Sequence, residues 1–262
     1  EVAEVMGYSD LGGRRAVEHF MQDYFTHATK VGELSRIFLT AMEAVSVKRE
    51  PNFLKVLKRK PRIGEGYILV QNRLAIAQPE AFLKNNLNLL RLFEEGLRTK
   101  LLIHPDAMRL VSANLYLIDQ NMRNSDEAVR IFRDLLLKHG NPERALRRMN
   151  ELGVLAAFIP EFKPIVAMMQ FNMYHSFTVD EHTIQTIGHL AAIERGELVE
   201  ELPVASAILG SGLNRKVIYI ALLLHDIGKG QIEDHSIAGA KIARDVAPRL
   251  GLNPRDSENV EW

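Results

Sequence analysis

The sequence of 262 residues contains no cysteine. This absence excludes disulfide bonds, thiolate metal sites and a cysteine nucleophile, and it fits a reducing compartment. No apolar run approaches the roughly 20 residues that a membrane-spanning helix needs. No pattern typical of a signal peptide opens the chain either. We therefore expect a cytoplasmic location and no membrane partner.

An excess of positive charge is also missing. Lys and Arg together number 33, and Asp and Glu number 33 as well, so the formal net charge is zero. Proteins that bind nucleic acids by neutralising phosphates usually carry a basic excess. We therefore expect no nucleic-acid partner. Apolar residues make up 47% of the chain, which is typical of a globular protein with a substantial core.

Most of the sequence has the periodicity of amphipathic helices, so the fold class is predicted to be mainly α. From Arg14 to Ala44, apolar residues recur three or four positions apart, which predicts one helix with a buried face. Between Glu201 and Leu213, a proline and two glycines predict a loop or a broken helix. Further helices are expected from Pro79 through Phe93, from Pro105, from Ser125, from Asn141-Pro142, over 217–227, over 236–250 and from Pro254.

One short hairpin interrupts the helical pattern. Residues 67–70 and 73–76 are rich in β-branched and other apolar side chains, and Gln71-Asn72 separates them. Just before the hairpin, residues 48–62 are strongly basic; this segment is either a solvated connector or a docking patch for an acidic partner. Prolines 160 and 164 indicate a boundary between domains 1–165 and 166–262.

The residues that indicate chemistry follow the most apolar of the predicted helices. His225 and Asp226 stand side by side at its end, where an imidazole and a carboxylate are costly unless they are paired or bind an ion. His182, near the start of a predicted helix, and His235, after Asp234, lie on either side along the chain. Three histidines and an aspartate would form a mixed nitrogen and oxygen site that suits Mn²⁺, Fe²⁺, Zn²⁺ or Mg²⁺.

This pattern resembles the HD superfamily of metal-dependent phosphohydrolases. The resemblance implies that His182 is the first metal-binding histidine, that His225 and Asp226 are the His-Asp pair, and that His235 is an additional metal ligand. It also implies that Lys229 holds phosphate oxygens and that Asp226 and Lys229 are the catalytic residues. His175, slightly upstream, is a weaker candidate for the first ligand. The superfamily has one more aspartate farther downstream, so we expect the metal site of this chain to be incomplete.

A more specific resemblance covers essentially the whole chain. The chain is similar to the bifunctional PII uridylyltransferase/uridylyl-removing enzymes, in which a helical region follows a nucleotidyltransferase domain and precedes an HD domain. The segments that carry this similarity are 16–24, 149–155, 158–162, 169–171, 174–175, 178–183, 225–230 and 234–236. The two ends of the sequence look cut. We therefore expect a helical region with a small hairpin at 1–165, then an HD domain truncated at its C-terminus.

The resemblance implies metal-dependent hydrolysis of the phosphodiester that joins UMP to a tyrosine of the nitrogen-regulatory protein PII. Uridylylated PII would be the partner, Mn²⁺ or Mg²⁺ the preferred metal, and glutamine would be sensed by domains outside this sequence. Three alternatives remain: an HD phosphohydrolase acting on free nucleotides or cyclic dinucleotides, a non-catalytic scaffold that docks PII, and an RNA-directed function like that of tRNA-end nucleotidyltransferases with an HD module.

Overall fold

The computed structural model describes residues 1–46, 62–169 and 177–261. Within these ranges the protein is mainly helical, as predicted, with one small sheet. Nearly all of the basic segment predicted over 48–62 lies outside the described residues, so its role as connector or docking patch stays open.

The predicted hairpin is confirmed. Strands β1 (Tyr67–Val70) and β2 (Arg73–Ile76) pair antiparallel, with Tyr67 opposite Ile76. Gln71 and Asn72 both have positive φ, 50° and 62°, as a two-residue turn that matches the twist of the strands requires. A third strand, β3 (Leu102–Ile103), pairs parallel with β2. The sequence analysis did not predict β3, because two residues are too few to show an alternating pattern.

Side-chain caps begin several helices where the sequence predicted. Ser125 accepts a hydrogen bond from the Ala128 amide, and Asn141 accepts one from the Arg144 amide. The helices that follow the hairpin are α4 (Pro79–Leu83), α5 (Asn88–Thr99), α6 (Pro105–Ala113), α7 (Gln120–Arg123), α8 (Asp126–Leu137), α9 (Pro142–Glu151) and α10 (Val154–Phe158), with 3-10 turns at Leu115–Leu117 and Pro160–Ile165.

The single helix predicted from Pro79 through Phe93 is wrong, because α4 ends at Leu83 and α5 begins at Asn88. Asparagines occupy the break. The side chain of Asn85 accepts a hydrogen bond from the Leu87 amide, and the Asn88 side chain donates to the Phe82 carbonyl. Such local side-chain bonds offer the backbone an alternative to the helix.

Five helices form the C-terminal part: α11 (Val179–Glu194), α12 (Pro203–Gly210), α13 (Arg215–Leu224), α14 (His235–Arg249) and α15 (Pro254–Glu261). Helix α12 corrects the loop or broken helix expected between Glu201 and Leu213. Pro203 stands in its first turn, where proline is well tolerated, and good helix formers follow. Helix α13 ends three residues earlier than the predicted 217–227, so His225 is its C-cap rather than part of it.

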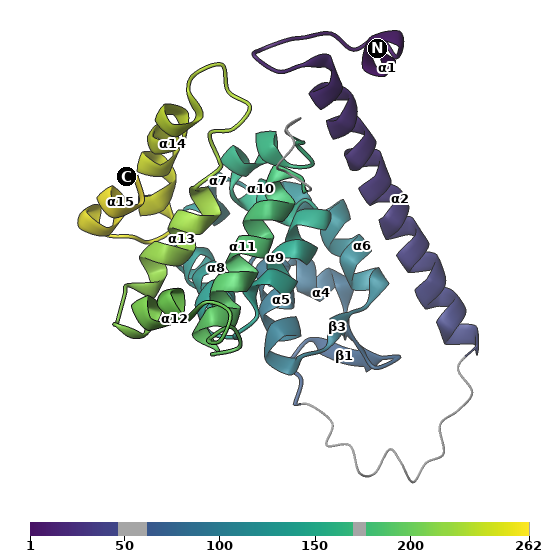
Figure 1. Cartoon of the computed structure of the whole chain (residues 1–262). Coiled ribbons are helices and arrows are strands. Elements are labelled where there is room, and N and C mark those ends of the chain that lie inside the picture. Colours follow the sequence, from purple (N-terminus) through teal and green to yellow (C-terminus); the bar gives the residue numbers. More distant parts are fainter. Residues whose placement is uncertain (47–61, 170–176, 262) are drawn as a thin grey trace.

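At the N-terminus, α1 (Val2–Val5) precedes the long helix α2 (Ala16–Ser46). The predicted helix is confirmed, but its apolar side is not one buried stripe. Val31, Leu34 and Phe38 are each more than half exposed. The period of a sequence reveals that one face is apolar, not what covers it. Figure 1 shows α2 running along one side of the molecule, with α13 to α15 on the opposite side.

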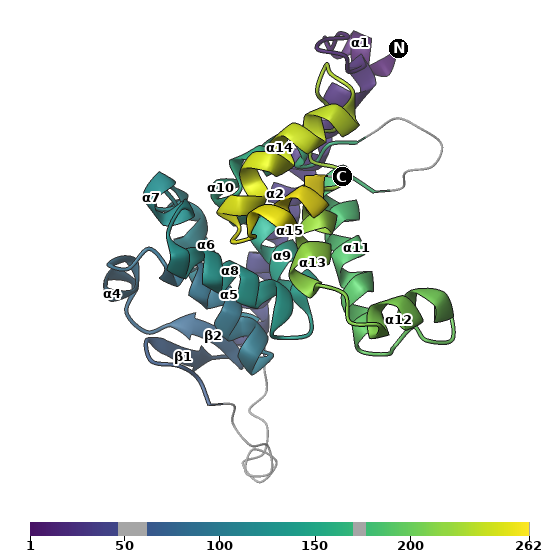
Figure 2. The same cartoon turned by 90° about the vertical axis from the view of Figure 1, so that its left-hand side faces the viewer.

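A single cluster of buried apolar side chains joins the two parts of the chain. It extends from Leu74 in β2 to Leu252 after α14, and it includes Phe132, Phe158 and Leu223. Figures 1 and 2 show the sheet at one end of the body and α14 at the other, with α5, α8, α9 and α11 between them. The domain boundary at 165/166 stays a prediction, since the buried cluster continues across it.

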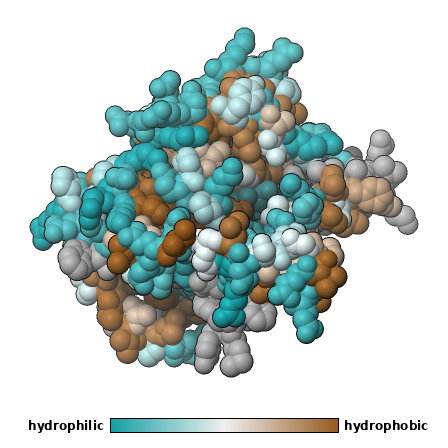
Figure 3. All heavy atoms as spheres, turned by 90° about the horizontal axis from the view of Figure 1, so that it is seen from above, coloured by the Kyte–Doolittle hydropathy of each residue, from teal (hydrophilic) through white to brown (hydrophobic). Residues whose placement is uncertain are grey.

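The surface has no large continuous apolar face in the view of Figure 3. That view, from above, is mostly hydrophilic with separate hydrophobic patches. Among the described residues, none of the helices combines the length and the apolar content that crossing a membrane demands.

Tyr219 provides a test of how α11 and α13 are held together. Its buried hydroxyl donates to Glu194 Oε2 over 2.7 Å, and Arg215 pairs with the same carboxylate. We expect Tyr219→Phe to lower the free energy of unfolding by about 1.5–3 kcal/mol, because a hydrogen bond to a charged acceptor is lost. Denaturant unfolding at pH 7 measures the change. Tyr116→Phe, which alters a hydroxyl on an exposed ring, is the matched control and should change little.

The same pair predicts a pH dependence. Burial raises the pKa of Glu194, but hydrogen bonds from Arg215 and Tyr219 outweigh burial and hold its pKa below the ordinary 4.5. A lowered pKa contributes stability above the unfolded pKa and loses it as the pH falls. The difference between wild type and Tyr219→Phe should therefore be full at pH 7 and shrink below about pH 4. A difference that stays constant down to pH 3 would contradict this account.

Candidate metal centre

Two packed helices bring the predicted site residues together. His182 lies in the first turn of α11, and His225 and Asp226 directly follow α13. The facing sides of these helices are apolar and fully buried, with Ile187 on α11 and Leu223 on α13. Packing of the two apolar faces therefore sets the orientation of His182 at the start of α11 and of His225 and Asp226 at the end of α13.

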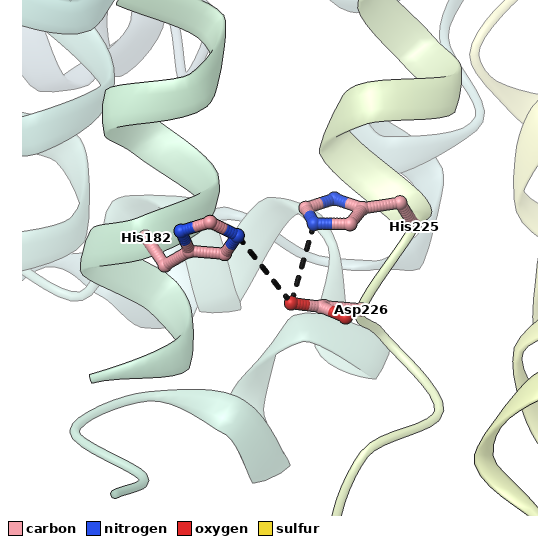
Figure 4. Close-up of side chains that lie close together, drawn as sticks. All are labelled: His182, His225 and Asp226. Atoms are coloured by element: carbon pink, nitrogen blue, oxygen red, sulfur yellow. Dashed lines mark ion pairs between the residues drawn. The ribbon is translucent and has the colours of Figure 1, made fainter. Parts of the chain in front are cut away.

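The three side chains converge on one carboxylate oxygen. Oδ2 of Asp226 lies 3.2 Å from Nε2 of His225 and 4.0 Å from Nε2 of His182. The two imidazole rings meet edge to face, with centroids 5.5 Å apart. Figure 4 shows both rings turned toward Asp226 from different helices. The structure thus brings together three of the residues that the sequence predicted to share a site, and their role as metal ligands stays a prediction.

The backbone of α13 determines which nitrogen of His225 faces the site. Nδ1 of His225 lies 2.6 Å from the carbonyl oxygen of Leu222. A carbonyl can only accept a hydrogen bond, so Nδ1 carries the proton and donates it. With Nδ1 held by this bond, Nε2 faces Asp226. In the protonated ring Nε2 donates to that carboxylate, and once its proton is lost Nε2 presents a lone pair to a cation. Metal-binding histidines are commonly oriented in this way by a bond from their other nitrogen. Sequence reasoning missed this role of Leu222, because a backbone carbonyl leaves no signal in the sequence.

Asp226 is ionised although it is only 8% exposed. Burial raises the pKa of its carboxyl, but hydrogen bonds from His225 and Lys229 outweigh burial and hold the pKa well below its usual range. Burial likewise lowers the pKa of His225, and the bonds to Asp226 and the Leu222 carbonyl outweigh it, so this pKa is raised. Asp226 thus carries a negative charge that its neighbours compensate.

The donor set fits a divalent cation. One ligand atom from each of His182, His225 and Asp226 lies within 4.8 Å of the other two. Ligand atoms bound about 2.0–2.2 Å from a metal lie roughly 3–4 Å from one another, so a slight closure of the three side chains is enough. Two imidazole nitrogens and a carboxylate oxygen suit Mn²⁺, Fe²⁺ or Zn²⁺ better than Mg²⁺, which prefers oxygen ligands.

Lys229 adds a positive charge to the site. Its Nζ lies 2.9 Å from the same Oδ2 of Asp226, and its side chain is nearly buried. Gly228 makes this turn compact. A Cβ on Gly228 would lie 2.2 Å from the backbone oxygen of His235 and 2.4 Å from the Gly239 nitrogen. Only glycine therefore allows α14 to approach the His-Asp pair so closely.

His235 and its neighbour Asp234 occupy the start of α14. Among the described residues, the ligand group that converges consists of His182, His225 and Asp226, and His235 is not part of it. The side chain of His235 is exposed, so its role as a metal ligand stays a prediction. Asp234 caps α14 by accepting from the Ser236 and Ile237 amides, which lowers its pKa. An ionised cap is a poor general acid. His175 lies outside the described residues.

Comparison with known proteins identifies the domain in which these side chains lie. The family model described as the HD domain matches residues 179–262, which contain all of the converging side chains. The chain therefore carries an HD domain. Two further models match before it: "Uridylyltransferase GlnD third domain" over 67–158 and "GlnD PII-uridylyltransferase" over 1–39.

Two curated relatives are similar along the entire chain. Bifunctional uridylyltransferase/uridylyl-removing enzymes from Ruegeria pomeroyi and Cereibacter sphaeroides are 70% and 65% identical over 262 residues. With the three family models, these identities show that the chain is similar over its whole length to a part of the bifunctional uridylyltransferase/uridylyl-removing enzymes. The chain spans 29% and 28% of the length of these two relatives.

The metal centre can be tested by binding alone. We expect Mn²⁺ added after chelation to raise the melting temperature of the protein. We expect His182→Ala to weaken Mn²⁺ binding at least about tenfold, because the one ligand that α11 contributes is lost. Thermal unfolding measures the first effect and calorimetric titration the second. His189→Ala changes an exposed histidine on the same helix and should bind Mn²⁺ like the wild type. Equal affinity of His182→Ala and His189→Ala would remove His182 from the ligand set.

Proposed function

We propose that this chain carries the uridylyl-removing activity: hydrolysis of the phosphodiester between UMP and a tyrosine of PII. The observation that carries the proposal is the convergence of His182, His225, Asp226 and Lys229 in the HD domain of a chain closely similar to two bifunctional uridylyltransferase/uridylyl-removing enzymes. The proposed partner is uridylylated PII in the cytoplasm, and glutamine would act through parts of the protein outside this chain.

The metal ligands would be His182, His225 and Asp226, with His235 as an additional predicted ligand. A bound divalent cation supplies Lewis-acid polarisation of the phosphoryl group and hydroxide near neutral pH. The hydrogen bond from His225 Nδ1 to the Leu222 carbonyl orients the ring so that Nε2 points into the site. Asp226 supplies the fixed negative charge that makes the site selective for a cation.

Lys229 is suited to stabilise the phosphoryl oxygens. Its ammonium already lies at the site, 2.9 Å from Asp226, on a flexible stem that can turn to a neighbouring anion. Charge that develops on the non-bridging oxygens during attack would be stabilised by this ammonium. The P–O bond to tyrosine breaks and water supplies the new P–O bond, so UMP and a free tyrosine result.

The leaving group requires little help from the protein. Tyrosine has a pKa of about 10, far below that of an aliphatic alcohol, so the tyrosinate can leave without a strong general acid. Asp234 is therefore not needed as a general acid, and its side chain accepts hydrogen bonds from backbone amides of α14 instead. His235 is then the remaining candidate for proton transfer in this segment.

The decisive experiment is UMP release from uridylylated PII, with Mn²⁺ or Mg²⁺ restored after chelation. We expect metal-dependent release by the wild type and none above background by Asp226→Ala with retained helical circular dichroism. Release by folded, metal-loaded Asp226→Ala would contradict the assignment. Preferential turnover of free nucleotides would favour a general HD phosphohydrolase, and PII binding without release would favour a scaffold.

Lys229 should separate catalysis from metal binding. We expect Lys229→Gln to lower the rate constant of hydrolysis about 10²- to 10³-fold, because one cationic donor to the phosphoryl oxygens is lost. Mn²⁺ affinity should be unchanged or higher, since the ammonium no longer competes for Asp226. Lys241→Gln, on the exposed side of α14, is the control. A loss of Mn²⁺ binding in Lys229→Gln would show that Lys229 acts by supporting the site.

A further inference from the structure

A cavity of about 520 Å³ lies on the other side of the first turn of α11. We call it the α11 cavity. Helix α2, helix α9 and the start of α11 form its walls, and the residues that matter here are Arg147, Asn150, Asp180 and Glu181. Asp180 and Glu181 directly precede His182 of the candidate metal centre, so the cavity and the centre share one turn of helix.

Asp180 has an unusual environment in this wall. Its carboxylate is only 4% exposed. Oδ2 accepts a hydrogen bond from the Asn150 side chain over 2.7 Å, but Oδ1 has no partner. A buried acceptor without a donor is destabilising, and more so for a charged group. Such an orphan indicates that something outside the described contacts donates to it.

Asn150 presents a second unpartnered acceptor beside the first. Its side-chain oxygen Oδ1 is buried and also without a hydrogen-bond partner. Because the Asn150 amide already bonds to Asp180, the two side chains are neighbours. The nearby guanidinium of Arg147 pairs with Glu143 and Glu181 instead. The wall of the cavity therefore offers two adjacent acceptors, one of them charged.

Two adjacent acceptors match two adjacent hydroxyl donors. We propose that the α11 cavity binds the ribose of the nucleotide, with Asp180 and Asn150 accepting hydrogen bonds from its 2′- and 3′-hydroxyls. Carboxylates recognise ribose hydroxyls in this way in dinucleotide-binding folds. The inference rests on the proposed function, because it assigns the nucleoside part of the UMP group whose phosphate meets the metal centre.

The helix geometry allows one ligand to reach both sites. Asp180 and His182 are two residues apart, about 3 Å along the helix axis, and their side chains point about 200° apart. A nucleotide that crosses the N-terminal end of α11 would meet Asp180 on one side and His182 on the other. The positive end of the helix dipole favours the phosphate in between.

Little movement is needed to expose the unpartnered oxygen. Asp180 lines the cavity, although its Oδ1 is itself buried. The terminal torsion of an aspartate is broad, so the carboxylate can turn at small cost. The Asn150 amide can follow, since it holds the other oxygen of the same group.

Binding of UMP and of its deoxy analogues tests the inference without any hydrolysis. In the presence of Mn²⁺, we expect the wild type to bind UMP at least about tenfold more tightly than 2′-deoxy-UMP or 3′-deoxy-UMP by calorimetric titration, because each lost hydroxyl leaves a buried acceptor unpaired. Asp180→Asn replaces the free oxygen with an N–H donor, so it should lose the preference for UMP over one of the two analogues and keep the preference that Asn150 provides over the other.

Asp106→Asn is the matched control. Asp106 is the second residue of α6, as Asp180 is of α11, but its side chain is exposed. This variant should keep the wild-type preference for ribose. Circular dichroism and the Mn²⁺ affinity of Asp180→Asn establish that the fold and the metal centre are retained. Because the analogues are compared on the unchanged protein as well, the test does not depend on the variant folding.

The outcomes separate this inference from the proposed function. Equal affinity of the wild type for UMP, 2′-deoxy-UMP and 3′-deoxy-UMP would overturn the inference, because water rather than ribose would then donate to the two oxygens. A failure of the wild type to bind UMP would overturn it as well. A preference for UMP over both analogues that Asp180→Asn removes for one of them would support it, even if uridylylated PII were not hydrolysed. Hydrolysis without any preference for ribose would overturn the inference alone.

Discussion

The candidate site depends on one oxygen atom, Oδ2 of Asp226. Three positively charged or protonatable groups from two segments, those of His182, His225 and Lys229, face this oxygen within 4.0 Å. A carboxylate that is almost completely buried has to be compensated in this way, because burial of an isolated charge costs far more than a typical domain can supply. The position of Asp226 therefore constrains how α11, α13 and the turn after α13 can pack.

That constraint extends into the backbone. The C-terminal end of α13 carries unpaired carbonyls, and one of them, on Leu222, orients His225. The next turn has to lead away from the site at once, since α14 packs directly against it. Gly228 permits this contact, because any side chain there would collide with the backbone of His235 and Gly239. The apolar helix, the His-Asp pair and the glycine thus form one structural unit.

Sequence reasoning succeeded where the signal is local. The hairpin was predicted from two apolar segments separated by Gln71-Asn72, and these two residues do have the positive φ values that the turn requires. The caps at Ser125 and Asn141 were predicted from the hydrogen-bonding capacity of their side chains. The grouping of His182 with His225 and Asp226 depended mainly on the resemblance to the HD superfamily. No spacing along the 42 intervening residues determines that two helices pack side by side.

The features that the sequence did not reveal depend on tertiary contacts. The apolar period of α2 is genuine, yet much of that face is exposed in the described chain, because periodicity does not identify a partner. The break between α4 and α5 arises from asparagine side chains that bond to nearby backbone. The sequence analysis assigned no role to Asp180. Its burial, its bond to Asn150 and its unpartnered oxygen arise only when α9 packs against α11.

The first turn of α11 connects the α11 cavity with the candidate metal centre. Within three consecutive residues it presents Asp180 to the cavity, Glu181 to Arg147 on α9, and His182 to Asp226. A helix fixes the angle and rise between successive side chains, so the ion pair of Glu181 with Arg147 sets the orientation of both neighbours. A loop could not hold two opposite-facing groups at a constant separation. The rigidity of this turn is therefore what would let a single nucleotide be held at its sugar and at its phosphate by adjacent residues.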